Sequence, residues 1–108
     1  MQNYLLIESR DNFGQPGGGL CIELARTLAD AGHAVSVLLV QNGVLPARAG
    51  AQAKGLAGLV AAGVPVLADE FSLAERGISA QQLSPGIRGS ALDVVIDRML
   101  GGWKVLWH

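Results

Sequence analysis

The sequence predicts one α/β domain over residues 1–108, with a mostly parallel sheet and helices on both of its faces. Short apolar runs alternate along the chain with segments of helical periodicity, which is the pattern of successive βα units. A length of 108 residues fits one domain. Half of the residues are hydrophobic and only 16% are charged, as expected where strands are buried on both faces.

The first strand is expected at residues 4–7, which form a continuous apolar run. A loop rich in glycine and polar residues follows at residues 9–19. From residue 20 a leucine recurs at every fourth position, which indicates one face of a helix, and Gly32 is placed to end that helix. A second strand is predicted at residues 34–40, before a sharp turn.

The middle of the chain predicts two further helices around a third strand. An alanine- and glycine-rich helix is expected over residues 46–62, with Pro46 in its first turn. The third strand is predicted at residues 64–68, where Pro65 suits an edge strand or the first position of a ladder. A short helix at residues 72–75 and a further turn up to residue 83 follow it.

The last part of the chain predicts a helix and a strand. A link at residues 84–87 has room for a very short fourth strand. Ser90 is placed to cap the next helix. Residues of that helix follow the spacing of one apolar face: Leu92, Val95, Ile96, Met99 and Leu100. The final strand is expected at residues 103–107.

Composition excludes several classes of function. The net charge is −1 and the eight basic residues are scattered, so no basic face for nucleic acid is expected. No apolar run is long enough to span a membrane and the start does not resemble a secretion signal, which points to the cytoplasm. A single cysteine, Cys21, excludes an internal disulfide and a cysteine-based zinc site. No cofactor is expected.

The low charge of so small a chain also predicts an apolar surface that another subunit covers. The expected interface candidates are residues 46–62, Trp103 and Trp107.

Polar side chains gather where the predicted strands end. In a parallel sheet, ligands bind at the carboxyl ends of the strands. The expected ligand-binding residues at that edge are Glu8, Ser9, Gln41, Asn42 and Asp69. One hypothesis is a small polar ligand held there. Another is an enzyme that uses Glu8, Asp69 and His108 as acid and base or around a metal. The candidate metal ligand is His108, although the spacing of these residues matches no known metal-binding motif.

The glycine-rich loop and Cys21 leave two alternatives each. Gly14 and Gly19 have the spacing of a phosphate loop, but Leu20 and Cys21 stand where lysine and serine or threonine are needed. The loop is therefore a plain connection or a simple anion site at a helix N-terminus. Cys21 lies on the apolar face of its helix and is either structural or a reactive thiol activated in the first helical turn. Cys21 and Asp69 are the candidate catalytic residues.

Six segments in order resemble the DsrE/DsrF-like family of sulfur-relay and sulfur-oxidation proteins: YLLIES at 4–9, LADAGHAV at 28–35, VQNGV at 40–44, GVPVLA at 63–68, ERGI at 75–78 and KVLW at 104–107. The resemblance implies a three-layer α/β/α sandwich with a five-stranded parallel sheet. It also implies a homo-oligomer, such as a trimer or hexamer, or a hetero-oligomer with related subunits, and a sulfur-carrier protein as a partner.

The sequence departs from this family at the position that carries its chemistry. Catalytic members have a cysteine just after the third strand that accepts and passes on a persulfide sulfur. Here that position falls close to Asp69, and residues 68–77 contain no cysteine. The resemblance therefore predicts a binding or assembly subunit without persulfide transfer of its own. The alternative is a sulfur carrier or transferase that uses Cys21.

Overall fold

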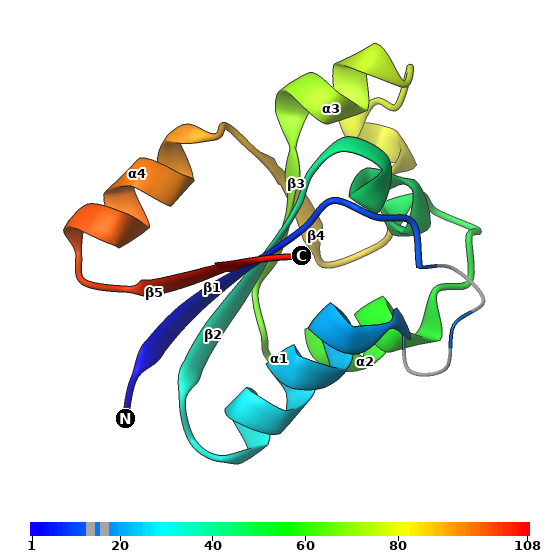
Figure 1. Ribbon diagram of the computed structural model, residues 1–108. Helices are drawn as coiled ribbons and strands as arrows, with labels where there is room; N and C mark the ends of the chain where they lie inside the picture. The colour runs from blue at the N-terminus through cyan, green and yellow to red at the C-terminus, as the bar shows by residue number, and fades with distance from the viewer. Residues whose placement is uncertain (13–14, 16–17) are drawn as a thin grey trace.

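Five parallel strands form one sheet in the computed structural model, which describes residues 1–12, 15 and 18–108. The sheet order is β4-β3-β2-β1-β5, and every neighbouring pair is parallel. The strands are β1 (Asn3–Glu8), β2 (Ala34–Leu39), β3 (Val66–Asp69), β4 (Ile87–Ser90) and β5 (Lys104–Trp107). The predicted α/β class with a five-stranded parallel sheet is confirmed (Figure 1).

Helices cover both faces of this sheet. On one face α1 (Leu20–Asp30) and α2 (Lys54–Ala61) lie side by side, and α4 (Asp93–Leu100) packs on the other face (Figure 1). The short helix α3 (Glu70–Glu75) follows β3 directly and contacts the 3₁₀ segment η2 (Gln41–Ala47), and η3 (Ala80–Gln82) precedes β4. Gly32 has a φ of 90° just after α1, the left-handed conformation that ends a helix, as predicted.

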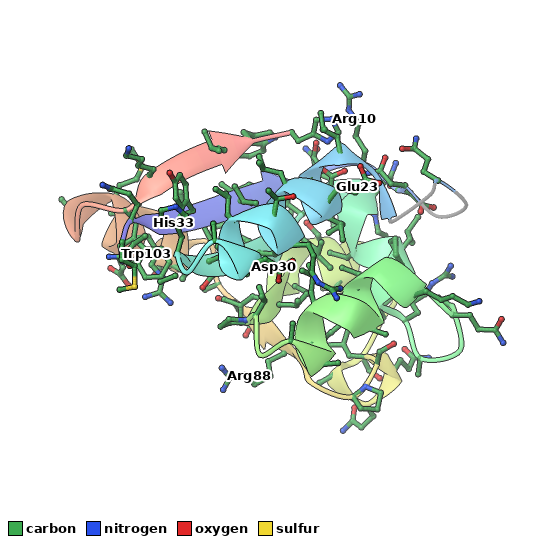
Figure 2. The ribbon with its side chains drawn as sticks, turned by 90° about the horizontal axis from the view of Figure 1, so that it is seen from below. Arg10, Glu23, Asp30, His33, Arg88 and Trp103 are labelled. Atoms are coloured by element: carbon green, nitrogen blue, oxygen red, sulfur yellow. The ribbon has the colours of Figure 1, made fainter. Side chains whose placement is uncertain are left out.

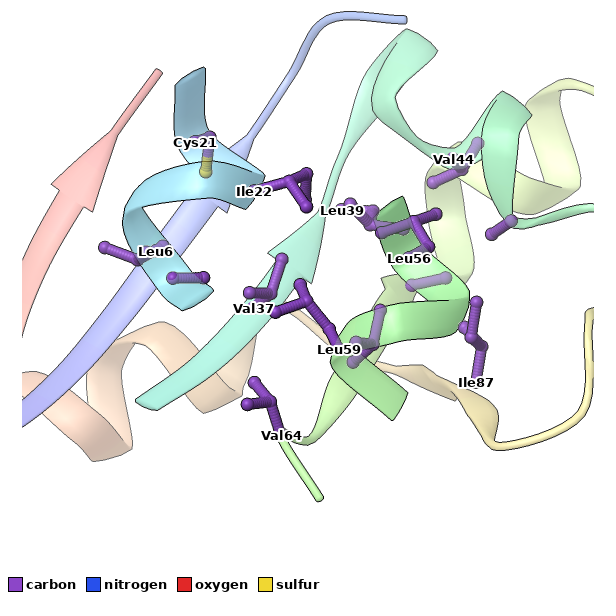
Figure 3. Packing of buried hydrophobic residues seen from close by; sticks show 14 of the residues in the cluster. Leu6, Cys21, Ile22, Val37, Leu39, Val44, Leu56, Leu59, Val64 and Ile87 are labelled. Atoms are coloured by element: carbon purple, nitrogen blue, oxygen red, sulfur yellow. The ribbon is translucent and has the colours of Figure 1, made fainter. Parts of the chain in front are cut away.

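The core is divided by the sheet into two unequal halves. Successive side chains of a strand point to opposite faces, so Leu6, Val37 and Leu39 pack under α1 and α2, where Ile22 and Leu59 meet them (Figure 3). On the α4 face a smaller cluster contains Leu5, Ile7, Leu38, Val40 and Leu67. The cluster under α1 and α2 is the larger one, and its residues Ile22, Leu39 and Leu56 also line the cavity described below.

The predicted helix over residues 46–62 is wrong in its first half. Pro46 lies inside η2, and regular helix begins only at Lys54. Between them Gly50 has a φ of 85° and Gln52 a φ of 57°, which a right-handed helix does not contain. The high alanine content of this segment therefore predicted a longer helix than the one that forms.

The other boundaries moved by a few residues. Strand β3 begins at Val66, and the carbonyl of Pro65 accepts from the Val37 amide, so Pro65 lies just outside an interior strand. The fourth strand lies at residues 87–90 and overlaps the expected link only at its last residue, Ile87. Ser90 is the last residue of that strand, opposite Asp69, and does not cap α4, which Leu92 precedes.

The apolar face predicted for the last helix is also mostly turned outward. Helix α4 packs on the sheet through Val94 and Val95, which are half-buried. The other apolar residues of that face are 48–83% exposed: Leu92, Ile96, Met99 and Leu100. Helical periodicity identified the helix correctly but not the side that meets the sheet.

Candidate functional site

The carboxylate of Glu8, at the end of β1, is the centre of a buried polar group. Glu8 is 2% exposed. One of its oxygens, Oε2, lies 2.7 Å from Nδ1 of His108, and the other, Oε1, accepts a hydrogen bond from the side-chain amide of Asn12. Strand β5 pairs with β1 so that Trp107 faces Ile7, which brings His108 to Glu8 across 100 residues of sequence.

The main chain fixes His108 in this position. Its amide donates to the Ile7 carbonyl at 2.8 Å. Its carbonyl accepts from the Ser9 amide at 3.0 Å and from the Ser9 hydroxyl at 2.9 Å. These contacts continue the β1–β5 ladder beyond the last residues of both strands, so the imidazole is held by backbone geometry as well as by Glu8.

Cys21 lies in the first turn of α1 and is 5% exposed (Figure 3). Its thiol interacts with the side chain of Glu8. Burial, then the charge of Glu8 and a hydrogen bond to its side chain raise the pKa of the thiol to about 12. These influences oppose and outweigh the helix dipole, which favours the thiolate. The thiol is therefore protonated at neutral pH.

Two glycines allow the chain to close around Glu8. A Cβ at Gly43 would overlap the Glu8 carbonyl oxygen, which itself accepts from the Val40 amide. A Cβ at Gly19 would stand 2.8 Å from Cγ of Asn12. Any larger residue at Gly19 would displace the amide that holds Glu8.

A cavity of about 400 Å³ opens beside this group, between α1, η2 and the start of α2. Its buried walls are Glu8, Asn12, Ile22, Leu39, Gly43 and Leu56. Its exposed rim carries the polar side chains of Arg10, Gln15, Gln52 and Lys54. Arg10 extends outward from the end of β1 (Figure 2). The cavity thus has a carboxylate at its base and two cationic side chains at its mouth.

A second polar group joins β3, α3 and η2. Oδ2 of Asp69 accepts from the amide of Ser72 at 2.9 Å and from its hydroxyl at 2.6 Å, so Asp69 caps α3. The Ser72 hydroxyl in turn accepts from the amide of Gln41 at 2.8 Å. Arg76 donates to the side-chain oxygen of Asn42 at 3.1 and 3.2 Å. This group ties the ends of β2 and β3 together.

The DsrE/DsrF-like family model matches residues 2–108. The chain belongs to the DsrE/DsrF-like family. Membership in this family associates it with sulfur metabolism. No curated protein sequence matches the chain significantly.

Solved structures share the fold of this DsrE-like chain. The ychN protein of E. coli is 23% identical and superposes with a TM-score of 0.86 over 100% of both chains. MTH1491 of Methanobacterium thermoautotrophicum, described as of unknown function, is 20% identical with a TM-score of 0.85, again over 100% of both chains. BT1422 of Bacteroides thetaiotaomicron is 16% identical with a TM-score of 0.77, over 98% of this chain and 95% of its own.

The DsrE-like fold divides the predicted site residues between the two polar groups. Glu8, Ser9 and His108 meet at the end of β1, whereas Gln41, Asn42 and Asp69 belong to the group around α3. Within residues 1–12, 15 and 18–108 no three His, Cys, Asp or Glu side chains are grouped to hold a metal ion, so Glu8, Asp69 and His108 form no such site.

Asn12, Ser72 and Arg76 also belong to these polar groups, although no pattern in the sequence singles them out. Asn12 stands in a loop of polar residues, and nothing in its spacing marks it as buried, yet it is only 7% exposed.

In the glycine-rich loop, Gly14 and Gly17 lie outside the described residues, and Gly18 borders the cavity. No helix in the described part of the chain is long and apolar enough to cross a membrane.

Proposed function

We propose that this DsrE-like chain is a binding or assembly subunit that does not itself transfer persulfide sulfur. The observation that carries the proposal is the environment of Cys21, the single cysteine of the chain. Sulfur transfer requires a thiolate that attacks the donor sulfur. With a pKa of about 12, roughly one Cys21 side chain in 100,000 is a thiolate at pH 7.

The side chain near the family's relay position supports the same conclusion. Asp69 is the last residue of β3, is 3% exposed and caps α3 through its hydrogen bonds with Ser72. A carboxylate cannot accept and release a sulfur atom as a thiolate does. Asp69 thus has a structural role in the fold and no redox chemistry to offer.

Incubation with a low-molecular-weight persulfide, followed by intact mass measurement, tests the proposal. The folded chain should gain no sulfur, whereas the same chain in denaturant should gain it on Cys21. The variant Cys21→Ser provides the matched control, since it should gain none in either state. A sulfur adduct on the folded chain that is then passed to an acceptor thiol would establish the alternative, a carrier that uses Cys21.

We also propose that a second copy of this chain covers the outer face of α4 and β5. Five apolar side chains there are 48–83% exposed: Leu92, Ile96, Met99, Leu100 and Trp107. Several exposed apolar side chains on one side of a small protein are typical of an interface. Strand β5 is also an edge strand, which leaves backbone groups open to pairing.

The charges around this face favour a copy of the same chain as the occupant. Asp93 and Asp97 lie on α4, and Arg98 lies in the last turn of the same helix. A two-fold axis sets one face against itself, so the acids of one copy can meet the base of the other. Of the interface candidates from sequence, Trp107 belongs to this face, whereas Trp103 is half-buried and lies 4.5 Å beneath the guanidinium of Arg98.

Light scattering coupled to gel filtration measures the predicted assembly. The wild type should elute as an oligomer, and Ile96→Glu should shift its mass toward that of one chain. Leu20→Glu is the matched control, because Leu20 is 66% exposed on α1, on the opposite side of the sheet. A monomeric wild type, or equal loss of mass in both variants, would contradict the assignment of this face.

A further inference from the structure

We propose that the cavity beside Glu8 binds a small zwitterion whose amino group and carboxylate are separated by an apolar chain. This inference rests on the proposed function, since it names the class of ligand that such a binding subunit takes. The amino group would lie at the base of the cavity, against Glu8. The carboxylate would lie at the mouth, between Arg10 and Lys54.

The cavity has the dimensions and the lining of a small-molecule site. Its volume of about 400 Å³ falls in the range of about 300 to 1,000 Å³ that is usual for such sites. The side chains of Ile22, Leu39 and Leu56 form apolar walls. An aliphatic chain is the part of a ligand that these walls would exclude from water.

The base of the cavity favours a cationic group. Glu8 is 2% exposed, and in the described chain its ion-pair partner is His108 rather than a lysine or arginine. An imidazole is charged only when it is protonated, so Glu8 has no permanent countercharge, and an unpaired buried carboxylate is unfavourable. Its two oxygens offer about four acceptor positions, and Asn12, His108 and Cys21 account for three of them. An ammonium group would use the remaining position and neutralise the charge.

The mouth of the cavity favours an anionic group. Arg10 and Lys54 are exposed side chains that line it, and Gln52 adds an amide. Helix α2 begins at the same place, and its N-cap residue, Ala53, has no side-chain hydrogen bond to the first turn. Among the described residues, none accepts a hydrogen bond from the amides at positions 54–56 of that turn, so these amides can bind an anion, and the helix dipole adds to the attraction.

The test uses 5-aminopentanoate as the probe, with pentanoate and pentylamine as matched compounds that each lack one charge. Titration of the ¹⁵N-labelled full chain should shift the amides of Gly43 and Gly55, which line the cavity. The zwitterion should bind at least about tenfold more tightly than either singly charged compound, because each end contributes a charge-assisted contact. Pentanoate that binds equally well would reduce the site to a plain anion site and overturn the proposal.

Variants separate the two ends of the site. Lys54→Ala should weaken binding by about tenfold without affecting the fold, since Lys54 is exposed. Glu8→Gln should remove the preference for 5-aminopentanoate over pentanoate, provided that its circular dichroism spectrum matches the wild type. Arg88→Ala is the control, because Arg88 is exposed on β4, away from the cavity (Figure 2). Unchanged affinity in Lys54→Ala would refute the assigned rim even if Glu8→Gln fails to fold.

The binding and persulfide experiments fail independently. A folded chain that takes up sulfur on Cys21 and still binds 5-aminopentanoate would overturn the proposed function alone. A chain that takes up no sulfur, and whose cavity amides do not respond to millimolar 5-aminopentanoate, would overturn only the assigned ligand class.

Discussion

Alkylation of Cys21 as a function of pH examines the buried thiol directly. Iodoacetamide reacts with the thiolate, so its rate follows the thiolate population. The pKa of Cys21 rises from 9.0 to about 12, which lowers that population about 1,000-fold at any pH well below 9. At pH 8 the folded chain should therefore react roughly 1,000 times more slowly than the unfolded chain, apart from any further protection by burial.

The assay measures the alkylation rate by mass spectrometry from pH 7 to pH 10.5, for the native chain and for the chain in urea. The urea sample should show a midpoint near the ordinary thiol value, whereas the native rate should still be rising at the highest pH. Glu8→Gln removes the second largest cause of the shift but leaves burial, so the native pKa should fall and yet stay above 9.0.

The same shift predicts how the stability of the fold depends on pH. A raised pKa means that the folded chain favours the neutral thiol, so this stabilisation is complete below pH 9.0 and is lost as the pH rises toward 12. The free energy of unfolding should decline more steeply above pH 9.0 in the wild type than in Cys21→Ala. A native alkylation rate within tenfold of the rate in urea at pH 8, with a midpoint near 9, would refute the reasoning.

The remaining predictions concern two glycines and the cap of α3, and each is checked by measuring the free energy of unfolding in urea. Gly43→Ala should lower it by about 1–3 kcal/mol, because the new methyl group meets the Glu8 carbonyl. Gly58→Ala, inside α2, should instead raise it by about 0.5–1 kcal/mol, since only the end of a flexible arginine lies nearby; equal effects would contradict this distinction. Asp69→Ala should remove about 0.5–2 kcal/mol by uncapping α3 and leaving Ser72 without its acceptor. A wild-type value in that variant would show that the cap is dispensable.

The strands and their parallel arrangement could be predicted from sequence because the signals are local. The apolar runs around residues 4–7 and 34–40 identify strands buried on both faces, and the helices between them require parallel neighbours. The segment from residue 46 shows where local signals mislead. Alanine favours a helix, but the chain there crosses the end of the sheet with positive φ values at Gly50 and Gln52. Tertiary placement overrode helix propensity.

The site was predicted at the correct edge of the sheet but not in its grouping. The rule that strand ends carry ligands placed Glu8, Asp69 and His108 together. The structure pairs only Glu8 with His108, because β5 lies beside β1 whereas β3 is separated from β1 by β2. Sheet order is set by contacts between distant segments, and the spacing of residues along the chain does not contain it.

By itself the sequence determined the α/β class, the family resemblance and the absence of a cysteine after the third strand, because each of these depends on residue identity and local periodicity. Only the tertiary structure decided three further features: that Cys21 is buried against Glu8, that a cavity opens beside them, and that the apolar residues of α4 face outward. These depend on which surfaces meet when the helices pack on the sheet. Burial and the neighbouring charge then decide whether a thiol is a nucleophile or part of the core.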